Sequence, residues 1–108
     1  MKAYVNNIIL INNLTVAKSF EARLVGLLNK KSIKDEGLLL MNCSSIHCFF
    51  MKFTIDAVYL SKDMNVLDKE TVSPWKIGKF VKKTKHVLEL PESAAKDIMI
   101  GDRIEFHE

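Results

Sequence analysis

Apolar residues along the first third of the chain recur at helical spacing. After Thr15, which suits a helix N-cap, the pattern continues through Val16, Phe20, Leu24, Leu27 and Leu28. Lys30 and Lys31 follow, where cations favour the negative end of a helix dipole. The sequence therefore predicts a first helix from about residue 16 to residue 28.

Short runs rich in branched and aromatic residues, typical of strands, occupy most of the remaining chain. They cover residues 3–5, 8–11, 37–40, 46–53, 55–60, 66–71, 84–90 and 103–106. A second short helix is predicted from Glu92 to about Met99, because Pro91 suits a first turn and Gly101 suits a stop.

These elements predict an α+β fold in a single compact domain that spans residues 1–108. Short strands need closure or a covering helix to protect their edges. We therefore expect a curved mixed or antiparallel β-sheet, or a partly open β-barrel, with two short helices.

Composition narrows the class of protein without naming a partner. Hydrophobic residues make up 48% of the chain, which is enough for a core, and no apolar run approaches the ~20 residues of a membrane span. Two cysteines without a framework pattern predict reduced thiols and a cytoplasmic location. The net charge of +3 is too small to identify a partner.

The stretch from Met41 to Asp56 holds Cys43, His47 and Cys48, the residue types that bind zinc. No C-x-x-C pair is present, and in a strand over residues 46–53 the adjacent His47 and Cys48 point to opposite faces. A tight turn and further ligands from His86 or His107 would be needed. We therefore predict no metal site and no cofactor.

The same geometry disfavours a Cys43–Cys48 disulfide, because five strand residues span roughly 16 Å. Catalysis by either thiol would require a neighbouring base or helix N-terminus. Buried thiols that act as small hydrophobic groups are the favoured interpretation, with Cys43 the better nucleophile candidate of the two.

Asp56 is the most informative polar residue, because it lies in an otherwise apolar segment and a buried carboxylate must find donors, a cation or water. The favoured interpretation is structural: Asp56 accepts backbone N–H groups of a turn around Phe53–Thr54. The functional alternative is a pocket carboxylate near His47 or Lys52, positioned for proton transfer or ligand binding.

Residues 74–86 hold five lysines and no acid, with Trp75 and Phe80 between them. This pattern suits a phosphate backbone and stacked bases. The lysines in question are Lys76, Lys79, Lys82, Lys83 and Lys85. Lysines also blunt exposed sheet edges, so nucleic-acid binding is the less favoured interpretation.

Several motifs, each weak alone, follow one another along most of the chain and together are specific. They are residues 23–28, 36–40, 43–47, 49–53, 55–56, 73–75, 87–90 and 101–103. On these motifs the chain resembles the domain of unknown function 192 family. The resemblance implies a compact α+β domain with a barrel-like mixed sheet. No enzymatic activity can be carried over from it, because no chemistry is established for the family.

Two positions depart from the family pattern. Thr54 stands where proline is frequent, which puts a rigid turn there in doubt, and Cys48 stands where threonine is common, which weakens the zinc and thiol hypotheses further.

Three hypotheses of function follow from the sequence. The first is a non-catalytic cytoplasmic binding or accessory domain for a small molecule or a protein. Its candidate ligand-binding residues are His47, Lys52, Asp56 and Trp75. The second is a small enzyme with His47 and Asp56 as an acid–base pair, and the third is nucleic-acid binding through Lys76 to His86.

Overall fold

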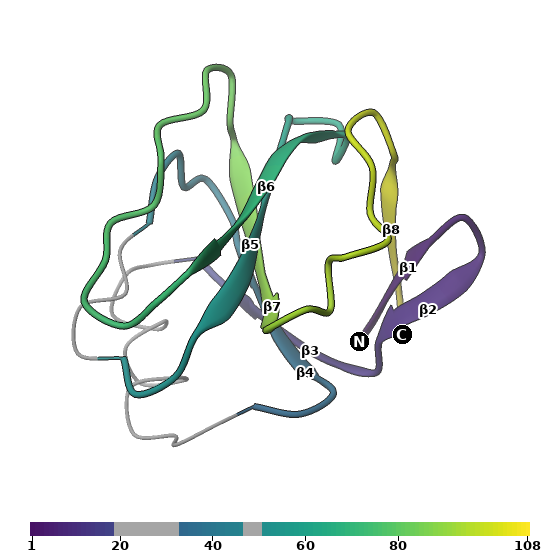
Figure 1. Cartoon of the computed structure of the whole chain (residues 1–108). Coiled ribbons are helices and arrows are strands. Elements are labelled where there is room, and N and C mark those ends of the chain that lie inside the picture. Colours follow the sequence, from purple (N-terminus) through teal and green to yellow (C-terminus); the bar gives the residue numbers. More distant parts are fainter. Residues whose placement is uncertain (19–32, 47–50) are drawn as a thin grey trace.

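The computed structural model describes residues 1–18, 33–46 and 51–108 (Figure 1). Eight strands form within these ranges. They are β1 (Lys2–Val5), β2 (Ile8–Ile11), β3 (Asn13–Ala17), β4 (Glu36–Leu40), β5 (Ile55–Leu60), β6 (Val66–Val72), β7 (His86–Pro91) and β8 (Ile104–His107). Every segment predicted as a strand, except residues 46–53, coincides with one of these strands to within two residues.

The larger sheet has five strands in the order β3-β4-β7-β5-β6. β3 pairs with β4 in parallel, and the other neighbours are antiparallel. Two inner strands of this sheet, β5 and β7, share a long antiparallel ladder from Ile55↔Pro91 to Leu60↔His86.

Both faces of the five-stranded sheet are covered, so all residues of β5 and nearly all of β7 are buried. Side chains alternate between the faces of a strand. Ile55, Ala57 and Tyr59 therefore belong to one hydrophobic cluster, while Val58 and Leu60 belong to a second cluster on the other face. A continuous apolar run is what a doubly covered strand requires.

The smaller sheet has the order β2-β1-β8 and packs against the second cluster through Ala3, Ile11 and Ile104. The β1–β2 connection is Asn6-Asn7, and both residues have positive φ (51° and 64°), as a two-residue type I′ hairpin turn requires. β1 and β8 pair along their length, so the ends of the chain lie side by side (Figure 1).

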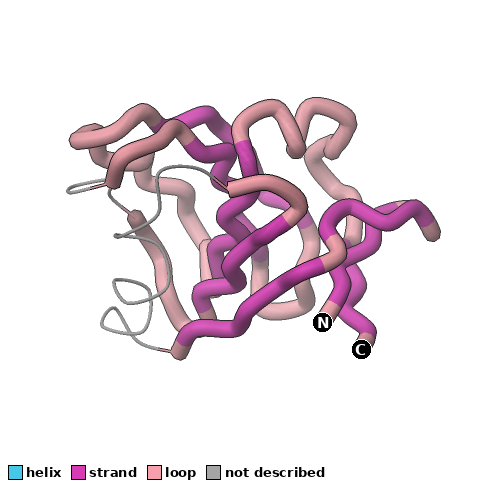
Figure 2. Tube along the Cα trace, turned by 90° about the horizontal axis from the view of Figure 1, so that it is seen from below, coloured by secondary structure: helices cyan, strands magenta, loops and turns pink. Residues whose placement is uncertain are grey.

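The predicted α+β class is wrong for the described residues. They form an all-β structure of two sheets that do not close into a barrel, and the coloured part of the tube shows strands and loops without a helix (Figure 2). No helix with the length and apolar character of a membrane span is found in those ranges.

The start of the first predicted helix is also wrong, because Thr15 lies inside β3 rather than at an N-cap. Thr15 and the residues on either side of it pair with β4, and Thr15 lies opposite Leu38. Leu14 and Ala17 are buried while Thr15 and Val16 are exposed, and the parallel ladder to a strand twenty-odd residues later overrides the local helical spacing. Residues 19–32, which carry the rest of this prediction, lie outside the described residues.

The second predicted helix, Glu92 to Met99, is a series of turns. Its hydrogen bonds join residues three apart, as in Ala94 N–H to the Pro91 carbonyl (3.0 Å), and they do not form a continuous helical ladder. Ser93 has a φ of 73°, in the left-handed region that interrupts a right-handed helix. We call residues 92–101 the turn segment.

The predicted strand over residues 46–53 is not present at Ile46 or at residues 51–53, which form loop and bends. Residues 47–50 lie outside the described part of the chain. Neither described end of this segment is therefore a strand that would direct His47 and Cys48 to opposite faces.

The loop that connects β6 and β7 (residues 73–85, the β6–β7 loop) packs very closely on the core at Gly78. The Gly78 N–H donates to the Ile46 carbonyl at 2.9 Å. A Cβ at Gly78 would lie 2.5 Å from the Tyr59 hydroxyl and 2.8 Å from Ile46 Cγ1. Only glycine fits this contact, because the neighbours are buried and the Tyr59 hydroxyl is held by a hydrogen bond to Glu70.

We expect Gly78→Ala to lower the free energy of unfolding by about 1–3 kcal/mol, the usual range for overpacking. Urea denaturation of the wild-type and variant proteins measures the change. Tyr59→Phe removes the nearest clashing atom, so it should cost less in the Gly78→Ala background than in the wild type. Strictly additive effects of the two substitutions would contradict the proposed contact.

Candidate functional site

Asp56 lies near the start of β5, opposite Thr71 on β6, and is 5% exposed. Both carboxylate oxygens accept hydrogen bonds. Oδ1 accepts from the Thr71 hydroxyl at 2.9 Å, and Oδ2 accepts from the Ala95 backbone N–H at 3.0 Å. The carboxylate therefore joins the sheet to the turn segment, and its partners are not the residues around Phe53–Thr54 that the sequence suggested.

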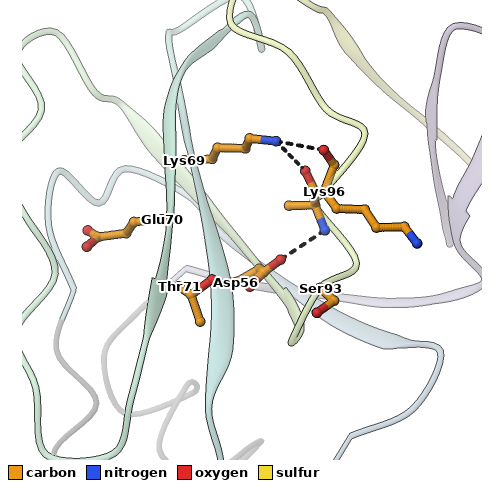
Figure 3. Close-up of a pocket in the computed structure, with 7 residues that line it drawn as sticks. Asp56, Lys69, Glu70, Thr71, Ser93 and Lys96 are labelled. Atoms are coloured by element: carbon orange, nitrogen blue, oxygen red, sulfur yellow. Dashed lines mark hydrogen bonds between the residues drawn. The ribbon is translucent and has the colours of Figure 1, made fainter.

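Lys69 reinforces this junction from the neighbouring part of β6. Its ammonium donates to the carbonyl oxygens of Ala95 (2.8 Å) and Lys96 (3.1 Å), and Figure 3 shows both bonds beside that of Asp56. Ala95 thus gives its N–H to a carboxylate and its carbonyl to an ammonium. Two charged side chains hold the backbone of the turn segment in place on both sides of Ala95.

A surface pocket of about 250 Å³ lies at this junction, lined by Asp56, Lys69, Thr71, Ser93 and Lys96 among others. Figure 3 shows the Glu70 carboxylate directed away from Asp56, on the other side of β6. Since Asp56 and Lys69 already bind backbone groups, using either for proton transfer would break a contact that holds the turn segment. The geometry here indicates a structural junction.

The other residues proposed from sequence are not gathered at this pocket. Lys52 is exposed in the bend before β5, and Trp75 is 59% exposed on the β6–β7 loop. Neither lines the pocket beside Asp56. His47 lies outside the described residues, so the proposed His47–Asp56 acid–base pair stays a prediction.

The metal and thiol candidates that the structure describes do not form a group of metal ligands. Cys43 is a free thiol whose Sγ donates to the Ser45 carbonyl at 2.9 Å. His86 is buried on β7, whereas His107 is on β8 of the other sheet, 3.5 Å from the Glu105 carboxylate. Within residues 1–18, 33–46 and 51–108, no group of three or more His, Cys, Asp or Glu side chains is placed to bind a metal ion.

The β6–β7 loop is fastened to β6 by two acids. The Glu70 carboxylate accepts from the Tyr59 hydroxyl (2.5 Å) and from the Lys79 backbone N–H (2.6 Å). The Lys79 ammonium lies 2.7 Å from Asp68. The hydrogen bonds from the Lys79 side chain and the Lys69 backbone N–H to Asp68 lower the pKa of that carboxyl below its ordinary value.

The outer side of this loop is unusually apolar. Three large side chains of one short stretch are exposed: Trp75 (59%), Ile77 (70%) and Phe80 (80%). All five lysines proposed for nucleic-acid binding are exposed too: Lys76, Lys79, Lys82, Lys83 and Lys85. Among contacts within the described part of the chain, Lys79 is the member of this set that forms an ion pair.

Sequence reasoning missed two acids. Glu70 on β6 fixes the β6–β7 loop, and Glu89 on β7 is 0% exposed. Both could have been found by asking which acids lie in or opposite an apolar strand, since a buried carboxylate always requires partners. The same question led to Asp56.

His86 at the start of β7 is held in its neutral form. Its Nδ1 accepts the Asn42 backbone N–H at 3.1 Å, so the ring proton is on Nε2. Burial of the imidazole, and then the nearby Lys85 ammonium, lower the pKa of His86 below its ordinary value of 6.5. This contact ties the turn after β4 to β7.

Comparison with known proteins gives a family without an assigned activity. The profile of the domain of unknown function 192 family, described as "Uncharacterized ACR", matches residues 5–106. A UPF0127 protein of Pyrococcus abyssi is 35% identical over 65 residues, which cover 58% of this chain and 56% of that protein. A UPF0127 protein of Pyrococcus horikoshii is 32% identical over 98 residues, 84% of each chain.

Two solved structures share the fold. A protein of unknown function from Novosphingobium aromaticivorans superposes with a TM-score of 0.73 at 17% identity, over 86% of this chain and 74% of that one. A putative transcription regulator from Sinorhizobium meliloti gives a TM-score of 0.72 at 20% identity, over 85% and 79%. At these identities the likeness concerns the fold alone.

We expect Asp56→Ala to lower the free energy of unfolding by about 1–3 kcal/mol, because it leaves the buried Ala95 N–H without an acceptor. Asp56→Asn should cost less, since its amide can accept from Ala95 and donate to the Thr71 hydroxyl. Urea denaturation measures both changes, with Asp63→Ala at an exposed turn as the control. An unchanged midpoint for Asp56→Ala would contradict this structural role.

The free energy of unfolding should fall as the pH drops below 6.5. The lowered pKa of His86 means that the unfolded chain binds its proton first, so the contribution of neutral His86 is present above pH 6.5 and is lost as the pH falls through its folded pKa. In His86→Gln this part of the slope should disappear. Urea denaturation of both proteins at pH 7.5 and 5.5 tests this, and equal slopes would contradict it.

Proposed function

The chain belongs to the domain of unknown function 192 family, and for this member we propose a non-catalytic binding domain that docks a partner protein through its β6–β7 loop. One observation carries the proposal: Trp75, Ile77 and Phe80 expose most of their surface on a single short stretch. Large apolar side chains that gather at a surface mark interaction sites.

The loop that presents these side chains is fixed before a partner arrives. The Gly78 N–H donates to the Ile46 carbonyl, and the Lys79 N–H donates to the Glu70 carboxylate. The Lys76 N–H donates to the Ser73 carbonyl at 3.1 Å within the same loop. A fixed loop loses little conformational entropy on binding, so the exposed apolar surface is retained as binding energy.

The chemistry of the surface favours a protein partner with an acidic rim. Trp and Phe are enriched at the centres of protein interfaces, and Ile77 between them has no π-face to stack on a base. Lys76 lies between Trp75 and Ile77, and Lys82 follows Phe80 by two residues. Both lysines are exposed, which suits acidic groups around the partner's apolar centre. Among the four ligand-binding candidates named from the sequence, we therefore assign Trp75 to binding.

Catalysis is less well supported than binding. Asp56 is committed to Thr71 and Ala95, and the thiol of Cys43 donates to a backbone carbonyl. We also propose a cytoplasmic location, which the free thiol of Cys43 supports.

Site-specific photocrosslinking tests the proposed surface. A benzoylphenylalanine is placed at Ile77, and at Ile100 as a control that is equally exposed, in the cells from which the chain comes. We expect a discrete protein adduct from position 77 that is absent from position 100. Mass spectrometry identifies the adduct, and the purified partner should bind the wild-type domain with an affinity that falls as salt rises.

Matched variants then distinguish specific binding at this surface from non-specific hydrophobic adsorption. Phe80→Ala should weaken binding of the purified partner by about tenfold or more, as expected for an interface anchor. Met99→Ala, which removes an exposed apolar side chain elsewhere, should leave the affinity unchanged. A nuclease-sensitive adduct would establish nucleic-acid binding instead, and no adduct or equal effects of the two variants would overturn the proposal.

A further inference from the structure

A second region of the molecule has the make-up of an anion site, and neither the family nor the proposed docking surface accounts for it. It is a pocket of about 420 Å³ on the surface near the start of β7. Residues of two separate turns line it: Ser61, Lys62, Asp63, Lys83, Thr84 and Lys85. We call it the turn pocket.

The fold brings the two turns together through the β5–β7 ladder. Leu60 at the end of β5 pairs with His86 at the start of β7, and the Lys85 N–H donates to the Leu60 carbonyl at 2.8 Å. Each turn is closed by its own hydrogen bonds. Ser61 Oγ accepts from the Asn65 N–H at 3.2 Å, and the Thr84 N–H donates to the Val81 carbonyl at 3.2 Å.

The lining carries an excess of positive charge. Lys62, Lys83 and Lys85 are all exposed, and none of them forms an ion pair within residues 1–18, 33–46 and 51–108. Three ammonium groups stand against the single carboxylate of Asp63. Like charges that line one pocket repel one another, and a bound anion relieves the repulsion.

Thr84 gives an independent sign of a missing partner. It is 9% exposed, and in the described part of the chain its hydroxyl Oγ1 is the buried side-chain polar atom without a hydrogen-bond partner. Such orphaned groups are rare in folded proteins and call for an explanation. Thr84 lines the turn pocket, so an anion bound there lies beside this residue.

We propose that the turn pocket binds the phosphate group of a small phosphate monoester. The dianionic phosphate balances the lysines, and its oxygens accept hydrogen bonds from the ammonium groups and the Thr84 hydroxyl. The volume exceeds the needs of an inorganic ion and falls within the range of small-molecule pockets. Asp63, which repels phosphate, accepts instead from a hydroxyl of the esterified part.

Titration of the isotope-labelled chain with glucose 6-phosphate, followed by amide NMR, tests the proposal. We expect saturable shifts at residues 61–63 and 83–85, weaker binding of inorganic phosphate, and none of glucose. Binding should weaken as salt rises. The proposal is overturned if glucose 6-phosphate gives no saturable shifts, if the shifts fall elsewhere, or if inorganic phosphate binds as tightly as the ester.

Two variants locate the binding. Lys83→Gln combined with Lys85→Gln should weaken the binding of glucose 6-phosphate by about tenfold or more, because two charge-assisted contacts are lost. Lys76→Gln combined with Lys82→Gln removes the same charge from exposed lysines outside the pocket and should change the affinity little. If the two double substitutions reduced the affinity equally, the effect would be one of general charge, and the proposed site would be overturned.

Thr84→Val separates binding from folding. Because it removes an unpartnered buried hydroxyl at almost constant shape, the free variant should resist urea at least as well as the wild type. Its affinity for glucose 6-phosphate should nevertheless fall about tenfold, in line with the loss of a hydrogen bond to a charged group. Unchanged affinity would exclude Thr84 from the site and contradict the proposal.

Discussion

Strands β5 and β7 have no face toward water, and most of the structure follows from this constraint. A hydrophobic cluster covers each side of the two strands, so any polar atom on them must find a partner inside the protein. Asp56 reaches the turn segment, Tyr59 reaches Glu70, and His86 accepts the Asn42 N–H. The bonds of Asp56 and His86 each fix a turn, and the Tyr59 bond orients Glu70, which accepts from the Lys79 N–H of the β6–β7 loop.

The polar contacts thus specify position, while the apolar contacts supply stability. Hydrophobic burial is non-directional, so two apolar clusters cannot decide where residues 92–101 or 73–85 lie on the sheet. Directional bonds from Asp56 and Lys69 decide it for the first segment, and those from Glu70 and Asp68 decide it for the second. The segments that carry the exposed side chains are therefore rigid where they meet the sheet.

The sequence predicts those parts of the fold that depend on local pattern. The branched run from Ile55 to Leu60 and the alternation after Arg103 identify β5 and β8 because burial on one or both faces leaves a trace in consecutive residues. The helix N-cap predicted at Thr15 is wrong, because a parallel partner more than twenty residues away decides the conformation of this residue. The helix predicted from Glu92 to Met99 is wrong because an N–H that a helix would use is bound by Asp56.

The candidate site around Asp56 is likewise only partly predictable from local sequence pattern. That Asp56 needs partners follows from its apolar neighbours, but its partner Ala95 lies 39 residues away, and no local pattern reveals it. The two halves of the turn pocket are likewise joined only by the β5–β7 register. Glu89, which is fully buried, lies in an apolar run of the sequence, as His47 does. A polar or charged residue in an apolar run of sequence is the shared signal.

The pairing of β1 with β8 has a consequence for how the chain is made. Residues 2–5 leave the ribosome about a hundred residues before residues 104–107, yet the two strands are neighbours in one sheet. One edge of β1 therefore stays open until residues 104–107 have been made, beside the exposed Ile8 and Ile9 of its hairpin partner. An open apolar strand edge on a nascent chain is a site where neighbouring chains can pair wrongly, so aggregation is a hazard during this interval of synthesis.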